Sequence, residues 1–253
     1  MPAVRTVRVT RYVTPLREGG SLPAIVEADD DGLYVLKFRG AGQGPKALIA
    51  ELVSGEVARA LGLAVPELVF AELDADLART EPDPEIFALI RDSAGLNLAL
   101  DYLPSSVMFD PVVEKPAGDL ASRIVWFDAY VTNVDRTARN TNMLMWHKRL
   151  WLIDHGATLY FHHSPDWAAH AGRARERFPL IRQHVLLTRA NALAAVDEEM
   201  AAALTPDALE RIVSLIPERW LADGDPDRKT YVRYLLDRRD APRGFVEEAI
   251  GAR

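Results

Sequence analysis

The 253-residue chain contains no cysteine. This absence excludes a disulfide scaffold, a thiolate nucleophile and a zinc–thiolate site, and it fits a reducing cytosol. Long apolar runs are also missing, because none of the runs present has the length needed to span a bilayer. Residues 1–5 lack the apolar stretch of a signal peptide. We therefore expect a soluble, cytoplasmic protein that has no membrane partner.

An excess of positive charge is equally absent. The chain has 30 Lys and Arg against 37 Asp and Glu, and its formal net charge is −7. A broad basic surface is therefore not expected, and neither is direct nucleic-acid binding. With 49% hydrophobic and 26% charged residues, the composition is ordinary for a globular protein. The length suits one large domain or two closely packed lobes.

The first hundred residues have the pattern of strands interrupted by one helix. Residues 4–13 alternate apolar side chains with Arg and Thr, as a half-buried strand does. Residues 29–32 form a strong hairpin signal, and Gly62 is placed to end the helix. The expected strands are residues 4–13, 23–28, 33–38, 68–73 and 86–91, and the expected helix is residues 46–61.

After residue 94 the balance shifts to helix. Residues 119–130 carry apolar side chains at helical spacing, and two short apolar runs around residues 147–149 predict a hairpin. Thr205-Pro206 and Asp225-Pro226 are typical helix starts. The sequence therefore predicts an α+β chain, with a small sheet-rich half (residues 1–93) and a larger helical half (residues 94–253).

The most informative stretch contains Asp135 and Asn140, followed by Asp154-His155-Gly156 beyond the expected hairpin. If that hairpin forms, Asn140 and Asp154 lie near one another at its open end, with Asp135 on the same side. Two carboxylates and an amide are hard oxygen donors that suit Mg²⁺. Phosphoryl transfer also needs a carboxylate to orient the attacking hydroxyl, and Asp135 could serve. The alternative is a pair of Asx turns around a surface hairpin.

Lys37 is a single lysine inside the apolar strand 33–38. Burying an ammonium group is costly without a partner, so Lys37 should pair with a carboxylate or with phosphates. The next helix offers Glu51 and Glu56, and we favour Glu51 because both of its flanks are apolar. The alternative is a lysine with a buried stem whose charged end reaches water.

Two further features are weaker. Gly20 and Ser21 belong to a turn between the first two strands, where a hairpin covering phosphates would be needed; an ordinary turn is the alternative. His162 and His163 are adjacent, and on an extended segment they would point in opposite directions, so a shared metal is not expected. Asp128, at the end of the helix before Asp135, either braces the following loop or is simply a polar residue at a helix end.

Taken in order, these elements resemble the HipA-like kinase family, which is related in fold to protein kinases and phosphoinositide kinases. The resemblance runs over most of the chain and is most specific over residues 121–156. It implies a two-lobed protein-kinase-like fold and an ATP- and Mg²⁺-dependent phosphotransferase. The matching pieces are Val35–Phe38, Ala50–Leu52, Arg59–Pro66, Asp135 with Asn140, and Asp154.

The resemblance also implies a role for each residue. Lys37 would contact the α and β phosphates of ATP, and Glu51 would anchor it. Asp135 would be the catalytic carboxylate, while Asn140 and Asp154 would hold Mg²⁺. The role of Gly20 and Ser21 in covering the nucleotide phosphates is expected from the position of their turn and not from the resemblance.

Three departures from the family and its relatives limit the comparison. The longer toxin kinases carry an extra N-terminal region that binds an antitoxin, and we expect this compact form to lack it, so a toxin role is not inherited. Thr137 stands where relatives often have a histidine. His155 replaces the Phe of the protein-kinase Asp-Phe-Gly triplet.

Three functions fit the sequence. The first is a kinase acting on a hydroxyl, for example that of Ser or Thr on a protein. The second is a regulatory nucleotide-binding module with little turnover. The third is an enzyme of the same fold that transfers AMP or acts on a small molecule. Lys37, Asp135, Asn140 and Asp154 are all chemically competent, which favours an enzyme. The identity of the acceptor has no fixed motif.

Overall fold

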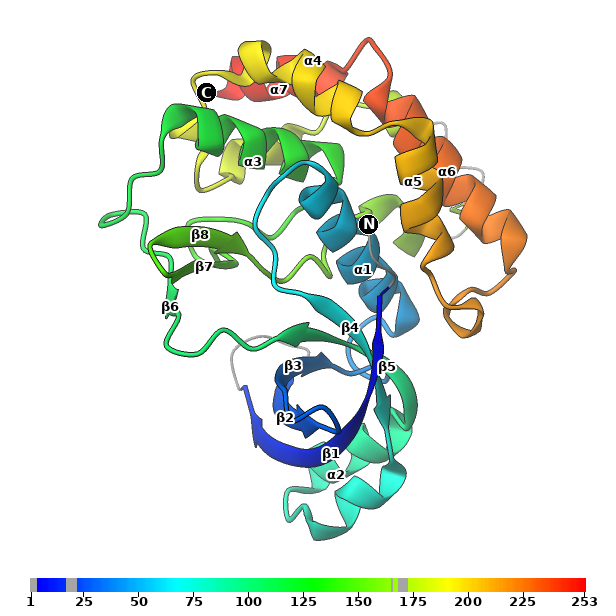
Figure 1. The fold of residues 1–253 in the computed structure, drawn as a ribbon. Helices are drawn as coiled ribbons and strands as arrows, with labels where there is room; N and C mark the ends of the chain where they lie inside the picture. Colours follow the sequence, from blue (N-terminus) through cyan, green and yellow to red (C-terminus); the bar gives the residue numbers. More distant parts are fainter. Residues whose placement is uncertain (1–3, 17–21, 165, 168–172) are drawn as a thin grey trace.

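The computed structural model describes residues 4–16, 22–164, 166–167 and 173–253. Figure 1 shows a barrel of strands at one end, a cluster of helices at the other, and helix α1 between them. The expected α+β class is confirmed. Gly20 and Ser21 lie outside the described residues.

The barrel is built from five strands that close in the order β1-β2-β3-β5-β4. Strands β1 and β4 form a parallel pair that closes the barrel, while the other neighbours are antiparallel. The side chains of Val26 and Leu36 are fully buried in its interior. The strands are β1 (Thr6–Pro15), β2 (Ala24–Ala28), β3 (Leu33–Lys37), β4 (Leu68–Leu73) and β5 (Gly95–Asp101).

One expected strand, residues 86–91, is wrong. These residues form helix α2 (Pro84–Asp92), outside the barrel and next to the 3-10 helix η1 (Ala75–Thr80). Asp83 caps the helix by accepting a hydrogen bond from the backbone N–H of Glu85 at 3.0 Å, and Pro84 occupies the first turn. The missing strand is β5, which contains five consecutive buried residues. Such a run does not alternate, so it lacks the period of a half-buried strand.

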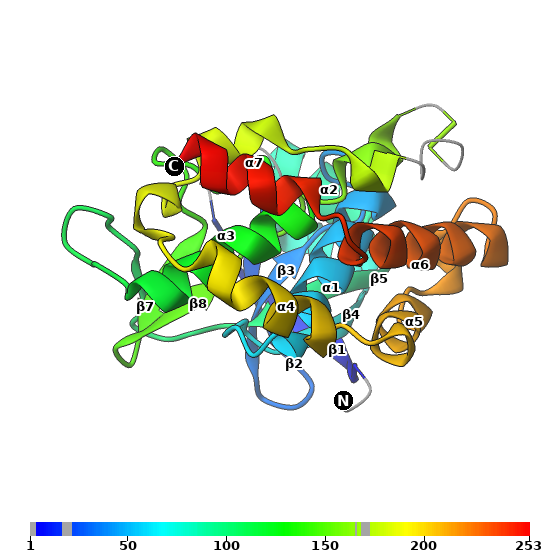
Figure 2. The same ribbon diagram turned by 90° about the horizontal axis from the view of Figure 1, so that it is seen from above.

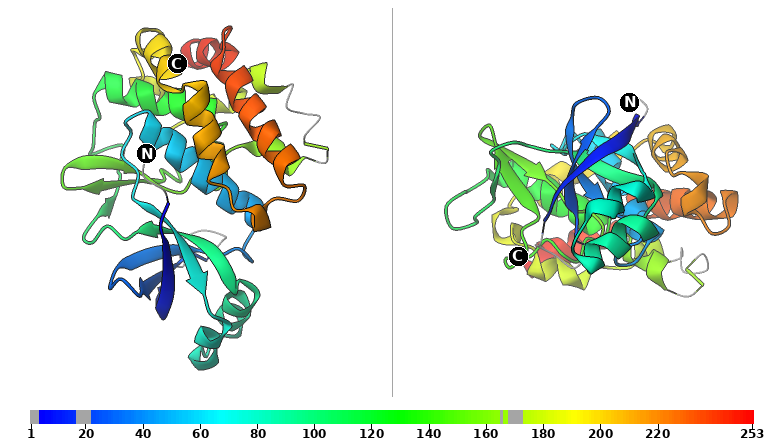
Figure 3. Two further views of the ribbon diagram at one scale, coloured as in Figure 1. Left: turned by 45° about the vertical axis from the view of Figure 1, so that its right-hand side comes forward. Right: turned by 90° about the horizontal axis from the view of Figure 1, so that it is seen from below.

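Helix α1 (Pro45–Ala60) is buried on all sides over residues 48–58. It contacts β5 of the barrel as well as α5 and the 3-10 helix η6 (Glu218–Trp220), and Figure 3 shows it between the barrel and the helices. The helix ends just before Gly62, whose φ of 75° is favourable for glycine. A carboxylate on such a helix must find a partner, because an unpaired buried charge is costly.

The other half begins with helix α3 (Gly118–Tyr130). The expected hairpin is confirmed as β7 (Met143–Trp146) and β8 (Arg149–Leu152), and β6 (Val107–Met108) adds a third strand. Short 3-10 helices follow in the described part of the chain, among them η2 (Tyr160–His163), η4 (Pro179–Gln183) and η5 (Leu187–Arg189). The remaining helices are α4 (Leu193–Ala203), α5 (Pro206–Ser214), α6 (Asp225–Arg239) and α7 (Gly244–Ala252).

Helices α3, α4 and α7 pack against one another, as the view from above shows (Figure 2). Their shared core contains Trp126 stacked on Tyr130 at 5.2 Å, with Phe245 edge-on to Trp126 at 5.4 Å. Aromatic pairs of this geometry add to the free energy gained from burying their surface. These contacts fix the C-terminal end of α3, from which the loop of residues 133–142 follows.

The division of the chain at residue 93 stays a prediction, and β5, which follows residue 93, belongs to the barrel. Among helices within the described part of the chain, none has both the length and the apolarity required to cross a bilayer.

Candidate active site

A cavity of about 550 Å³ lies where β3, α1 and the loop after α3 meet. One side is formed by residues 37–51, and the other by residues from the loop after α3 and from the segment 154–163. It is lined by all of the described residues that the sequence suggested for a nucleotide site, namely Lys37, Glu51, Asp135, Asn140 and Asp154. The structure therefore brings together side chains that are up to 117 positions apart.

Lys37 occupies the last position of β3, and its side chain is only 12% exposed. Its Nζ lies 2.7 Å from Oδ1 of Asp154 and 3.6 Å from Oε2 of Glu51. Burial alone would lower the pKa of Lys37, but the two carboxylates outweigh it and raise the pKa above its ordinary value. Lys37 is therefore a fixed cation at the edge of the cavity.

Glu51 is held from both halves of the molecule. Its Oε2 accepts a hydrogen bond from the backbone N–H of His155 at 2.9 Å, and its Oε1 lies 3.3 Å from the ring Nδ1 of His155. Burial opposes ionisation, yet Lys37 and these hydrogen bonds keep the pKa of Glu51 below its ordinary value. Glu56, the other candidate, pairs with Arg59 at 3.2 Å.

His155 thus has a function that the sequence alone did not suggest. Its ring is fully buried, packs edge-on against Phe127 at 5.7 Å, and contacts the carboxylate of Glu51. The residue that replaces Phe in the Asp-Phe-Gly triplet therefore adds a polar connection between α1 and the other half.

The loop of residues 133–142 fixes Asp135 through amide groups. Asn140 and Asn142 both donate from Nδ2 to Oδ2 of Asp135, at 2.8 and 3.2 Å. The backbone N–H of Asp135 donates to Oδ1 of Asn133 at 3.0 Å. Within the described residues, Oδ1 of Asp135 has no hydrogen-bond partner, so one oxygen is fixed and the other is available in the cavity.

Asp128 is the centre that supports this loop, so the bracing interpretation is the one the structure favours. Its Oδ2 accepts from Nε of Arg136 at 2.7 Å and from Nε2 of His184 at 2.8 Å. Its Oδ1 accepts from Nδ2 of Asn133 at 2.7 Å. Arg136 also donates to the backbone carbonyl of Asn142. Burial opposes ionisation of Asp128, but Arg136 and His184 lower its pKa well below the ordinary value.

His184 was missed by the sequence analysis. The backbone N–H of Leu186 donates to its Nδ1 at 3.0 Å, so the ring proton is on Nε2 and points to Asp128. Its backbone also forms an antiparallel bridge with Thr137. A histidine from a distant segment therefore supports the loop, and no local motif marks it.

The family follows from the sequence as a whole. A model of the HipA-like kinases matches residues 9–239. The chain belongs to the HipA-like kinase family. It is accordingly a kinase, an enzyme that transfers a phosphoryl group from ATP to a hydroxyl-bearing acceptor. Comparison with curated proteins gave no match.

One solved structure supports the kinase-like fold, and two others are also similar. The proinflammatory kinase CtkA of Helicobacter pylori matches with a TM-score of 0.57 and 13% identity, over 99% of each chain. The Golgi casein kinase matches with a TM-score of 0.49 and 13% identity, over 100% of this chain and 72% of that one. Its form with Mn and ADP bound matches with a TM-score of 0.46 and 12% identity, over 96% and 75%.

The oxygen atoms of this HipA-like kinase fit Mg²⁺. Asp154 uses Oδ1 for Lys37, and Asn140 uses Nδ2 for Asp135, so neither Oδ2 of Asp154 nor Oδ1 of Asn140 has a partner among the described residues. The described residues contain no group of three or more His, Cys, Asp or Glu that could hold a metal by themselves. Mg²⁺ commonly takes one or two protein oxygens and completes its shell with phosphates and water.

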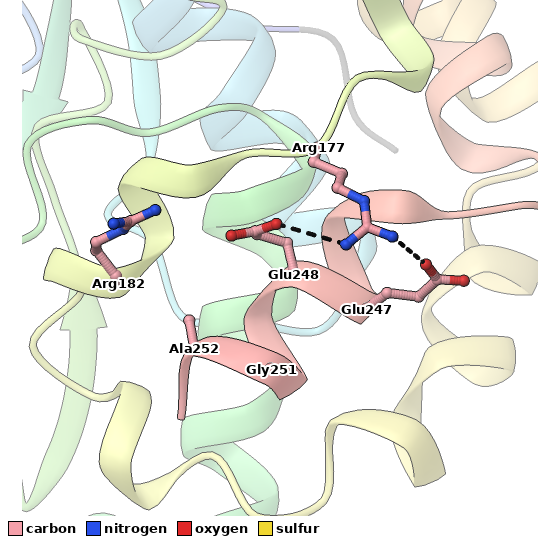
Figure 4. Close-up of a pocket in the computed structure, with 6 residues that line it drawn as sticks. All are labelled: Arg177, Arg182, Glu247, Glu248, Gly251 and Ala252. Atoms are coloured by element: carbon pink, nitrogen blue, oxygen red, sulfur yellow. Dashed lines mark hydrogen bonds and ion pairs between the residues drawn. The ribbon is translucent and has the colours of Figure 1, made fainter.

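A second cavity, of about 480 Å³, lies between α7 and the segment that leads into η4 (Figure 4). Two arginines line it: Arg177 reaches Glu247 at 3.0 Å and Glu248 at 3.7 Å, and Arg182 donates from Nε to the carbonyl of Pro179 at 2.8 Å. It shares no residue with the first cavity. The described residues that the sequence suggested for a nucleotide site line the first cavity and not this one.

We expect Asp128→Asn to lower the free energy of unfolding by about 3–5 kcal/mol, because it leaves Arg136 buried without a counter-charge. Urea unfolding measures this loss. Asp119→Asn is the control, since Asp119 lies on the same helix and is exposed, and this substitution should cost less than about 1 kcal/mol.

The folded pKa of Asp128 is depressed, so its contribution to the free energy of unfolding is complete above the unfolded pKa of roughly 3.9 and declines as the pH falls toward the folded value. The gap between wild type and Asp128→Asn should therefore narrow in acid; a constant gap would contradict the assignment.

We expect Glu51→Gln to lower kcat/KM for phosphoryl transfer from ATP roughly tenfold to a hundredfold, because Lys37 loses a charged partner. Glu56→Gln is the matched control on the same buried helix and should stay close to wild type. An equal loss in both variants would show that the effect comes from the helix rather than from Lys37.

Proposed function

We propose that this kinase transfers the γ-phosphoryl group of ATP, with Mg²⁺, to the hydroxyl of a Ser or Thr residue in a protein. The observation that carries the proposal is the convergence of Lys37, Asp135, Asn140 and Asp154 on one cavity. Such a set provides a cation for phosphates, oxygens for a metal and a carboxylate for the acceptor.

On the nucleotide side, Lys37 would bind the phosphates. Its present partners, Asp154 and Glu51, already hold its ammonium group at the cavity edge. Asn140 and Asp154 would hold Mg²⁺ through the oxygens that have no protein partner among the described residues. When bound, Mg²⁺ neutralises charge on the phosphates and orients them.

On the acceptor side, Asp135 would orient the hydroxyl. A bond forms between the acceptor oxygen and the γ-phosphorus, while the bond from that phosphorus to the β–γ bridging oxygen breaks and ADP leaves. The hydroxyl proton passes to Oδ1 of Asp135, which is unpaired within the described residues. The two amides on Oδ2 keep the carboxylate in place during the step.

The charge balance of the cavity supports a neutral acceptor. Three carboxylates (Glu51, Asp135 and Asp154) and one fixed cation, Lys37, line it. Like charges in a confined site repel, so an anionic acceptor is disfavoured relative to an uncharged hydroxyl such as that of Ser or Thr. A cytoplasmic location belongs to the same proposal, since a cysteine-free chain fits a reducing compartment.

Incubation with γ-labelled and α-labelled ATP tests the reaction type. We expect label from γ-labelled ATP alone on a protein or peptide acceptor, and its loss when Mg²⁺ is removed with EDTA. Label from α-labelled ATP would instead show AMP transfer, and ATP binding without transfer would show a regulatory module. Phosphoamino-acid analysis of the labelled acceptor distinguishes Ser and Thr from Tyr.

We expect Asp135→Ala to lower the transfer rate by about 10²–10⁴-fold while ATP binding is largely kept, because Asp135 acts on the acceptor side. Rates from γ-labelled ATP and nucleotide affinity from calorimetry measure the two effects separately. Asp207→Ala, at an exposed position on α5, is the control. Equal transfer by Asp135→Ala and wild type would refute the role.

A further inference from the structure

The segment that follows Asp154 forms a wall of the cavity that the proposed mechanism does not use. Gly156, Tyr160 and His163 line this wall, and residues 41–43 of the loop before α1 line the same cavity. The wall is anchored to the end of α3, because the backbone N–H of Leu159 donates to the carbonyl of Val131 at 2.7 Å. Its groups therefore have fixed positions relative to the loop that carries Asp135.

His162 and His163 do not point in opposite directions as expected for an extended segment. They lie in the 3-10 helix η2, where successive side chains are about 120° apart rather than 180°. Their Nε2 atoms are 3.0 Å apart. His162 is fully buried, and its Nδ1 lies 2.9 Å from the hydroxyl of Tyr231 on α6. The three side chains form one hydrogen-bonded row that ends at the cavity.

The donor and acceptor of each hydrogen bond in this row follow from its buried end, the hydroxyl of Tyr231. Among the described residues, the Tyr231 hydroxyl has no hydrogen-bond partner other than Nδ1 of His162, so we assign its proton to this hydrogen bond. His162 is neutral, because burial, His163 and Lys46 hold its pKa well below the ordinary value. With Nδ1 accepting, the ring proton of His162 is on Nε2 and is donated to Nε2 of His163.

The tautomer of His163 is set by its hydrogen bond with His162. Burial and the nearby Lys46 also lower the pKa of His163, so its ring is neutral at physiological pH. Since Nε2 accepts, the proton is on Nδ1. This Nδ1 has no partner among the described residues and is not one of their buried unsatisfied atoms. His163 therefore has an uncharged N–H donor to offer to a ligand.

We propose that His163 binds the acceptor through this N–H group, and that Tyr231, acting through His162, is a positioning residue that keeps the donor on Nδ1. The inference rests on the proposed function and names the group that would recognise the acceptor. A neutral donor suits a neutral oxygen, and in a cavity with three carboxylates a carbonyl group is such a partner. A Ser or Thr residue in a peptide carries a backbone carbonyl close to its hydroxyl. His163 would thus bind the peptide backbone while Asp135 orients the hydroxyl.

The tautomers can be measured without any turnover. Full-length protein with ¹⁵N-labelled histidine should show the ring proton of His163 on Nδ1 and that of His162 on Nε2 by long-range ¹H–¹⁵N correlation. Tyr231→Phe should reduce the Nδ1–H population of His163, whereas Tyr234→Phe, a buried control on the same helix, should not. A His163 ring protonated on Nε2 or on both nitrogens would overturn the proposal.

Binding is tested with blocked serine (N-acetylserine N-methylamide) in the presence of Mg²⁺ and a non-hydrolysable ATP analogue. The Nδ1–H resonance of His163 should shift with blocked serine and not with glycerol, which has hydroxyls but no carbonyl. No shift with blocked serine would refute the binding role. Equimolar Zn²⁺ binding that shifts both histidine rings would also overturn it, because the pair would then be a metal site.

Kinetics separate this inference from the proposed function. With degenerate Ser/Thr peptides, His163→Ala should raise the peptide KM about tenfold, as for the loss of one hydrogen bond, and leave the ATP KM much less affected. Tyr231→Phe should act in the same direction, and His163→Asn, which keeps an N–H near the position of Nδ1, should restore much of the loss. His147→Ala, at an exposed turn, is the control.

The outcomes are distinct. A wild-type protein with no transfer from γ-labelled ATP would refute the proposed function, and the resonance measurements would still decide the state of His163. Wild-type transfer with an unchanged peptide KM in His163→Ala and Tyr231→Phe would refute this inference alone.

Discussion

The candidate active site depends on the buried ion pair between Asp128 and Arg136. The two oxygens of Asp128 hold Arg136, Asn133 and His184, and Arg136 in turn reaches the strand that begins after Asn142. Loss of any of these partners would leave a buried charge incompletely paired, and this cost opposes rearrangement of the loop. Asp135 lies between Asn133 and Arg136, which both bind Asp128, so its position is fixed by these contacts.

The second constraint crosses between the barrel and the helical half. Lys37 on β3 and His155 after β8 both contact Glu51 on α1, which is a helix buried on all sides. Any rotation of α1 would expose or unpair the Glu51 carboxylate, which is costly in a low-dielectric interior. The position of Lys37 is therefore coupled to the segment that carries Asp154.

The strands and helices with clear periodicity were predictable, as the hairpin 143–152 and helix 118–130 show. Residues 86–91 were not, because a short apolar stretch is compatible with a strand or a helix until Asp83 and Pro84 are recognised as its start. Strand β5, in contrast, is a strand that the sequence pattern did not indicate. Its residues are buried on both faces within the barrel, so no alternation marks it.

The sequence by itself determined which reactive side chains are present: a lysine in an apolar strand, and Asp135, Asn140 and Asp154 at their spacing. It also determined the family, because the HipA-like kinase model matches residues 9–239. Only the tertiary structure decided which side chains support these groups. His184 meets Asp128 across 56 positions, and Tyr231 meets His162 across 69, in segments with no local signal. Such contacts follow from the packing of whole helices and loops, whereas local sequence encodes only the nearest turns.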